Sequence, residues 1–422
     1  MPLTVSPPNP SNKYQQYLFR TNVIFVLLFT SSFSTPTRYI PNLRAYTDPI
    51  FEQLALWTGT LILRLQEPFI YQLTSDSTGA FIHSLNLIVL ALVGAWLWGQ
   101  IQPNLNYSKI SYAFYTYIRY YLALQLFLYG FNKVFKCQFF LPEPNTLYTP
   151  VGKVSKDLLF WSAMGSSYFY TVFGGILEVL AASLLLFRKT YLLGSLMAFG
   201  ILTNVLAINL GFNISVKLYA SFFLFLSFTL ISPYLQSLYA FFIHQKVSKS
   251  KIWFPTFSSS KRRFQYSFIK TISIWFLLFE CLVPYFKVNN FNDDTQTRPL
   301  FHGAYRVTSF TKEGFSIPPL PTFSKRWKRV FIHRRGYLIV QTMDEKMQDY
   351  QFRYNLTSQQ FLLEHTETLI EYPLEYQQSE RGDLTLNGFI EGQDIQVRLT
   401  QLDWEQLPLL RQDFSWTIDA IL

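Results

Sequence analysis

Apolar stretches of about twenty residues recur through the first two thirds of the chain, and they restrict its fold more than any other feature. A helix of that length crosses the hydrocarbon core of a bilayer. The stretches cover residues 17–34, 80–100, 113–135, 167–187, 190–211, 214–232 and 267–286. We therefore predict an α-helical integral membrane bundle with about seven spanning helices.

Composition agrees with a membrane protein. Hydrophobic residues make up 50% of the chain and charged residues only 15%, against roughly 25% charged residues in soluble proteins. The net charge is +10, yet residues 287–422 hold 15 Lys and Arg against 18 Asp and Glu. The positive excess therefore lies among the apolar segments, where basic residues mark cytoplasmic loops and meet lipid headgroups. The expected partner is a lipid bilayer, and no nucleic acid is expected.

The basic loops predict an orientation. The segment from Lys246 to Phe264 has six basic residues and no acidic one, which places it in the cytoplasm. We therefore expect a multi-pass protein of the inner (cytoplasmic) membrane, with a cytoplasmic N-terminus and an extracytoplasmic region after Tyr285. The segment from Asp48 to Gln66 is broken by polar residues, and it is interpreted as an amphipathic helix on the membrane surface, with a further span as the alternative.

Four regions follow from these patterns. Residues 1–111 hold the N-terminal membrane helices and the amphipathic segment, 112–245 a four-helix core, and 246–286 the basic loop and the last membrane helix. Residues 300–422 have a different texture, with short runs of alternating apolar and polar residues separated by turn residues. Such runs predict an all-β, barrel-like extracytoplasmic domain, and lipocalin-like closure would leave no exposed edge strand.

Polar residues inside the apolar segments are the candidate site. Glu178 lies near the middle of its stretch, where a carboxylate is costly and needs a partner or a role. We predict an outward-facing cavity with Glu178 at its floor and two lysines nearer its mouth. The alternatives are an ion-pair strut for Glu178 and headgroup-directed lysines and arginine. The candidate ligand-binding or proton-handling residues are Glu178, Lys133, Lys217, Asn204, Asn209, Arg119, Gln125 and Tyr129.

The cysteines and histidines carry little signal. Cys137 and Cys281 are too few for a disulfide framework, and they show no metal-ligand spacing. Both are predicted to lie in the same leaflet, so whether they pair is left open. The five histidines are scattered, so no haem or zinc site is predicted and no cofactor motif is evident.

Residues 112–245 resemble the DoxX-like membrane family. The matching features are Gly130-x-x-Lys133, an interhelical segment with Gly152 and Trp161, Gly175-x-x-Glu178, and the stretch NVLAINLGFNISVKL from Asn204 to Leu218. With its additional helices and β-rich tail, the whole chain is similar to the longer DoxX-like proteins of Bacteroidota.

The resemblance implies a four-helix core associated with quinone-linked redox complexes. The first hypothesis is therefore a subunit or accessory of such a complex, with membrane redox subunits as partners and a quinone or lipid bound in the outward cavity. The second is a non-catalytic ligand-binding or assembly protein whose β-domain takes an apolar ligand or an extracytoplasmic partner. A vitamin-K-dependent-carboxylase-like enzyme is a further alternative, with Lys133 or Lys217 as base. Whether the chain is catalytic stays open.

Overall fold

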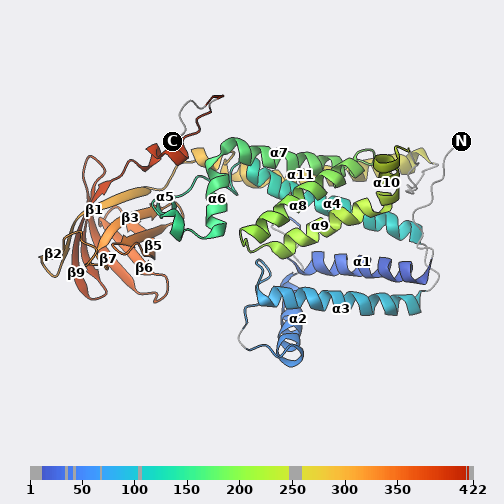
Figure 1. Cartoon of the computed structure of the whole chain (residues 1–422), viewed down its shortest axis with the longest axis horizontal. Coiled ribbons are helices and arrows are strands. Elements are labelled where there is room, and N and C mark those ends of the chain that lie inside the picture. Colours follow the sequence, from blue (N-terminus) through green and yellow to red (C-terminus); the bar gives the residue numbers. More distant parts are fainter. Residues whose placement is uncertain are drawn as a thin grey trace. The chain divides into compact units, whose positions relative to one another are not determined.

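The structure is a computed structural model, and it describes residues 12–33, 37–40, 44–66, 69–102, 107–246, 259–414 and 416–417. The chain forms two compact units (Figure 1). The helical unit comprises Met1–Gln138 and Val172–Phe291, and the barrel unit comprises Phe139–Thr171 and Asn292–Leu422. The interhelical segment, residues 139–171, thus belongs with the barrel, although it lies between two helices of the other unit in the sequence.

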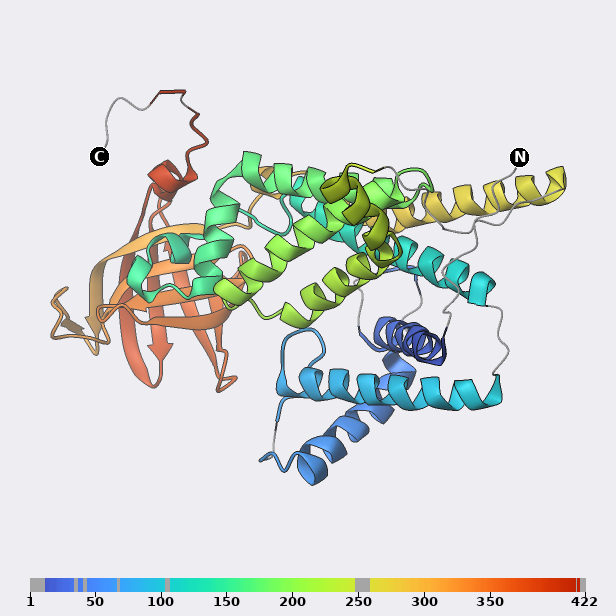
Figure 2. The same cartoon turned by 45° about the vertical axis from the view of Figure 1, so that its right-hand side comes forward.

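The helical unit is built mainly from long helices. They are α1 (Lys13–Ser32), α2 (Arg44–Trp57), α3 (Thr78–Ile101), α4 (Tyr107–Val134), α7 (Tyr168–Leu185), α8 (Tyr191–Gly211), α9 (Lys217–Ile231), α10 (Leu235–His244) and α11 (Ser260–Val288). A π-helical turn, Thr58–Ile62, continues α2. In both Figure 1 and Figure 2, α2 runs at a steep angle to α3.

Aromatic side chains hold the helices together. The rings of Phe29 on α1 and Phe222 on α9 stack with centroids 3.7 Å apart, and Phe25 packs edge-on against Phe222 at 6.0 Å. Helix α1 also contacts α4, where the hydroxyls of Thr30 and Tyr117 lie 2.6 Å apart. Ring pairs of this kind add stability beyond the area they bury.

Five helical segments in the described part of the chain are long and apolar enough to cross a membrane. They are Thr78–Ile101, Tyr168–Leu185, Tyr191–Gly211, Lys217–His244 and Ser260–Thr295. The predicted stretches 17–34 and 113–135 are also helical, as α1 and α4, but they are not among these five. Five spans therefore match the prediction, and the count of seven stays a prediction.

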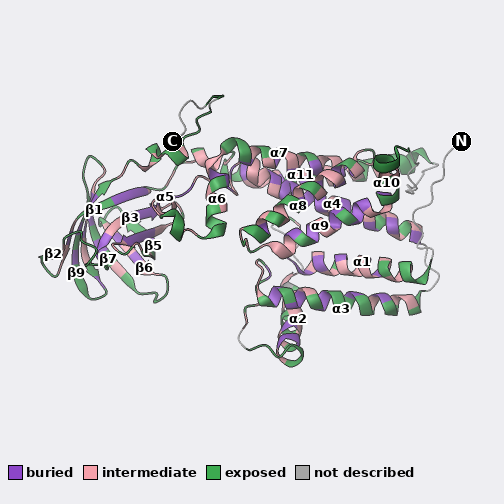
Figure 3. Ribbon diagram, viewed as in Figure 1, coloured by how far each residue is buried: buried purple, intermediate pink, exposed green. Residues whose placement is uncertain are grey.

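Many residues of these helices are exposed (Figure 3), and a large share of the exposed residues are apolar. On α3, for example, Phe81, Ile88, Val93 and Trp96 are each more than 40% exposed. A soluble protein rarely exposes so continuous an apolar face. The pattern indicates a surface that contacts lipid and is consistent with a membrane protein.

The barrel unit contains one antiparallel sheet. Its strands are β1 (Gly303–Lys312), β2 (Phe315–Ser316), β3 (Trp327–His333), β4 (Tyr337–Thr342), β5 (Met347–Asn355), β6 (Gln360–His365), β7 (Glu371–Gln378), β8 (Leu384–Ile390) and β9 (Gln393–Gln401). Neighbouring strands follow the chain in the order β2-β1-β3-β4-β5-β6-β7-β8-β9. Strand β1 also pairs with β9, which closes the sheet, so the predicted barrel is confirmed.

Alternation along the strands explains why the sheet closes around a core. On β9, Ile395, Val397 and Leu399 are buried, while the residues between them are exposed. At one end the interior is filled by aromatic rings, with Phe361 stacked on Tyr376 at 4.4 Å and Phe301 edge-on to Phe361 at 5.0 Å.

Two short helices of the interhelical segment, α5 (Pro144–Leu147) and α6 (Lys156–Ser166), belong to the barrel unit. The ring of Tyr148 stacks on Phe331 of β3 at 5.8 Å. Phe331, Ala304 and Ile339 form a separate apolar cluster with Tyr148 on this side of the sheet. The segment therefore covers apolar residues that would otherwise be exposed on the outside of the barrel.

Candidate functional site

Glu178 lies in α7 and is paired with Lys133 of α4. The lysine Nζ donates to both carboxylate oxygens, at 2.9 and 2.8 Å. The side chains are 11% exposed for Lys133 and 5% for Glu178. A buried pair of this kind is costly to break, because removing one partner leaves an uncompensated charge. This geometry agrees with the alternative in which Glu178 forms an ion pair that joins two helices, and Lys133 contacts both oxygens of the carboxylate.

Two glycines bring these helices close enough for the pair to form. A Cβ placed on Gly175 would lie 2.7 Å from the carbonyl oxygen of Gly130, and one on Gly130 would lie 3.0 Å from the oxygen of Gly175. Only a residue without a side chain fits at this crossing of α4 and α7. Lys133 follows Gly130 by one helical turn, as Glu178 follows Gly175, so the two charged side chains meet.

The remaining predicted residues are divided among several places. Tyr129 joins the pair, since its ring centroid lies 5.8 Å from the Lys133 ammonium. Lys217 does not, because its ammonium lies 3.5 Å from Asp76 and its backbone N–H donates to the same carboxylate. Each lysine that a carboxylase-like mechanism would use as base is thus held by a carboxylate.

The other four predicted residues do not gather around Glu178 either. Gln125 is buried, and its Nε2 has no hydrogen-bond partner among the described residues. Asn209 donates to the carbonyl of Val216 at 3.5 Å, and Asn204 is exposed. Arg119 donates from Nε to the carbonyl of Leu185, at the C-terminus of α7, at 3.0 Å. The structure thus brings together Glu178, Lys133 and Tyr129 only.

A second candidate site is a cavity of about 770 Å³ in the barrel unit. Its apolar wall is supplied by Phe310, Trp327, Ile390 and Ile395, all of which are buried. The volume falls within the range of about 300–1,000 Å³ that is usual for small-molecule sites. The aromatic rings of Phe301, Phe361 and Tyr376 do not line this cavity. The interior of the barrel is therefore filled in one region and hollow in another.

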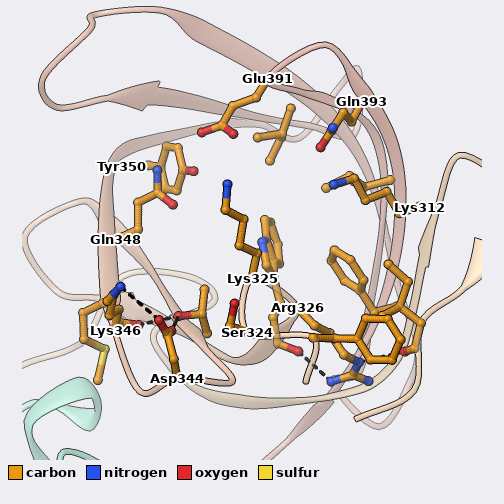
Figure 4. Close-up of a pocket in the computed structure, with 18 of the residues that line it drawn as sticks. Lys312, Ser324, Lys325, Arg326, Asp344, Lys346, Gln348, Tyr350, Glu391 and Gln393 are labelled. Carbon is orange, nitrogen blue, oxygen red and sulfur yellow. Dashed lines mark hydrogen bonds and ion pairs between the residues drawn. The ribbon is translucent and has the colours of Figure 1, made fainter. Parts of the chain in front are cut away.

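Polar and charged side chains line the rest of the cavity (Figure 4). Lys325 extends toward the middle of the opening, and the carboxylate of Glu391 and the hydroxyl of Tyr350 face it. Lys312 points into the cavity from another side. Among the described residues, neither Lys312 nor Lys325 forms an ion pair, so both amines are available to a ligand.

Nearby groups set the protonation of the cavity wall. Burial raises the pKa of the Tyr350 hydroxyl, and the charge of Glu391 raises it further, so this hydroxyl remains a donor at neutral pH. Hydrogen bonds from Thr342 and Lys346 lower the pKa of Asp344 to about 2. Arg326 is buried, and its guanidinium donates to the backbone carbonyls of Ile317 and Trp327. These hydrogen bonds hold the side chain in the cavity wall.

The basic residues of the stretch Lys325–Arg335 lie in several different environments. Lys325 lines the cavity, Arg326 is buried, and Arg334 donates from Nε to Glu143 at 3.0 Å. These three residues flank β3 and do not lie in it, so the alternation of residues along that strand was no signal for their positions.

Glu143 anchors the interhelical segment to the barrel and was not predicted. Its carboxylate lies 2.9 Å from Nε2 of His302 and 3.8 Å from Nε2 of His333, besides contacting Arg334. Burial raises the pKa of Glu143, but the His302 hydrogen bond and the charges of the two histidines and Arg334 outweigh it, so the pKa is lowered. No local motif marks these residues, because they come from three separate stretches of the chain.

The comparisons with known proteins leave the family open. No protein-family profile matches the chain. An uncharacterized protein of Bacillus subtilis (strain 168), YwoB, is 36% identical over 99 residues, which are 24% of this chain and 62% of that protein. The chain therefore spans less than two thirds of the relative it matches, and no solved structure matches it.

Cysteine and metal chemistry add little to either site. Cys137 and Cys281 do not form a disulfide with each other in this structure. Within the described ranges, no three His, Cys, Asp or Glu side chains are grouped so that they could hold a metal ion.

Proposed function

We propose that this protein is a membrane-embedded binding protein whose β-barrel takes an amphiphilic, lipid-like ligand. The cavity of about 770 Å³ carries the proposal, because its apolar wall suits a hydrocarbon part and its lysines and Tyr350 suit a polar head. Polar groups placed around an apolar pocket fix the orientation of a ligand. On the predicted topology the barrel lies outside the cytoplasm, where it would meet lipid-like molecules at or near the membrane surface.

The test uses the full-length protein in nanodiscs and a dansyl-labelled fatty acid as probe. We expect saturable fluorescence enhancement above that of empty nanodiscs. Gln393→Trp fills the cavity from an exposed rim position and should abolish the saturable signal, and Lys325→Gln should weaken probe affinity roughly tenfold, the effect of losing a charge-assisted contact. Arg398→Gln removes an exposed charge from β9 outside the cavity and serves as the control. Equal binding by Gln393→Trp and the wild type would refute the proposal.

The quinone-linked redox subunit, of DoxX-like kind, is the second candidate. It is favoured by the position of Tyr129 beside the Lys133–Glu178 pair and by the open hydrogen-bonding capacity of Gln125 on the same helix. Against it, Lys133 already occupies both oxygens of Glu178. Reduced-minus-oxidised spectra of the purified protein test this candidate, because a bound quinone would give its difference band and its absence would leave the barrel as the ligand site.

A further inference from the structure

Three cationic side chains meet where α7 ends and α8 begins. Arg119 of α4 is 5% exposed and stacks on the ring of Tyr191, 4.7 Å from its centroid. Arg188 follows α7 and stacks on the ring of Tyr266 at 4.6 Å. Lys270 of α11 lies 4.8 Å from the ring of Phe187, within the electrostatic range of both arginines.

Tyrosine hydroxyls complete the cluster. Arg188 donates to the hydroxyl of Tyr112 at 2.7 Å, and that hydroxyl lies 3.0 Å from the hydroxyl of Tyr266. Arg119 donates from Nε to the carbonyl of Leu185, and in the described part of the chain its other guanidinium donors form no ion pair with a carboxylate. The cluster thus presents several N–H and O–H donors from three helices.

The helices that build this cluster carry no acidic residue to neutralise it. In residues 107–135 and 168–291 the only carboxylates are Glu178 and Glu280. Glu178 is bound to Lys133, and Glu280 accepts the backbone N–H groups of Arg38 and Tyr39. Like charges held close together in a partly buried site repel each other, so an anion bound among them would stabilise the arrangement.

We propose that Arg119, Arg188 and Lys270 bind the phosphate group of an anionic lipid headgroup. Arginine and lysine donors with tyrosine hydroxyls match the oxygens of a phosphate, which charge-assisted hydrogen bonds recognise. The cluster lies at the end of apolar helices and beside the turn that carries Lys189, and basic pockets between membrane helices bind such headgroups. A soluble phosphate compound would offer the same chemistry, so the experiment separates the two sources.

The experiment measures thermal unfolding of the full-length protein in a neutral detergent. Added phosphatidylglycerol should raise the Tm in a saturable way, because a ligand that binds only the folded state stabilises it. Phosphatidylcholine, which has no net charge, and inorganic phosphate should not. A shift with inorganic phosphate equal to that with phosphatidylglycerol would overturn the assignment to a lipid.

Variants locate the effect. Lys270→Gln and Arg188→Gln should each weaken the response to phosphatidylglycerol on the order of tenfold in lipid concentration, and Lys270→Arg should retain it. Lys189→Gln removes an equal, exposed charge from the residue next to Arg188 and should respond like the wild type. In neutral detergent without lipid, Lys270→Gln should be at least as stable as the wild type, because it relieves repulsion.

Two results would refute the site. An unchanged lipid response in Lys270→Gln, with lower stability in neutral detergent, would show that Lys270 serves packing alone. An equal loss of response in Lys189→Gln would show that the lipid acts through diffuse surface charge. Native mass spectrometry of the phosphatidylglycerol bound to each variant gives a second readout that does not depend on unfolding.

Discussion

Replacing Glu178 by Gln tests the buried pair directly, because Gln preserves the shape of the side chain and removes its charge. The change leaves the ammonium of Lys133 in a site where that side chain is only 11% exposed. Breaking a fully buried pair costs about 3–5 kcal/mol. Since Lys133 keeps some contact with solvent, we expect the free energy of unfolding to fall by about 3 kcal/mol, the lower end of that range.

A double variant separates the pair from other effects of the substitution. Glu178→Gln with Lys133→Met removes both charges and should return to within about 1 kcal/mol of the wild type. The matched control is Glu178→Gln with Lys217→Met, which should not recover, because the Lys217 ammonium lies 3.5 Å from Asp76. The assay is equilibrium unfolding of the purified protein in mixed micelles, followed by circular dichroism.

The reasoning would be refuted by either of two outcomes. A Glu178→Gln protein as stable as the wild type would mean that the charge of Lys133 is not buried in solution. Equal recovery with Lys217→Met would mean that the second lysine also reaches the carboxylate. Normal stability with lost quinone binding would instead support the redox candidate.

Three further predictions concern the helix crossing, the barrel and the topology. Gly175→Ala should lower the free energy of unfolding by roughly 1–3 kcal/mol, measured in the same assay, because the added Cβ meets the carbonyl of Gly130. The pKa values of Glu143 and His333 are both lowered in the fold, so their stability contributions are complete at neutral pH. The His333 contribution is lost as the pH falls below about 6.5, the pKa of the side chain in the unfolded chain. The Glu143 contribution is lost as the pH falls below about 4.5, the corresponding pKa of its carboxyl. A Tm that does not fall between about pH 7.5 and 4 would contradict this. Alkaline phosphatase fused after Leu422 should be active, whereas activity only in a fusion after Ser250 would reverse the predicted orientation.

Much of the architecture could be predicted from the sequence, because each element depends on a local pattern. Apolar runs of spanning length predicted the membrane helices, and alternation of period two predicted the barrel. Glu178, near the middle of its apolar stretch, was likewise predicted to need a partner or a role, since an isolated charge is costly there. Helices α1 and α4 were predicted correctly as helices, but they are not among the five segments that are long and apolar enough to cross a membrane, so their role as spans stays a prediction.

Tertiary structure alone decided which groups meet. The sequence places both Lys133 and Lys217 near helix ends, and only the crossing at Gly130 and Gly175 selects Lys133 as the partner of Glu178. The same holds for Glu143, whose partners lie more than 150 residues away in the chain. Periodicity determines which face of an element is apolar, whereas the contact between two faces depends on backbone approach and register, and these are set by the packing of the whole unit.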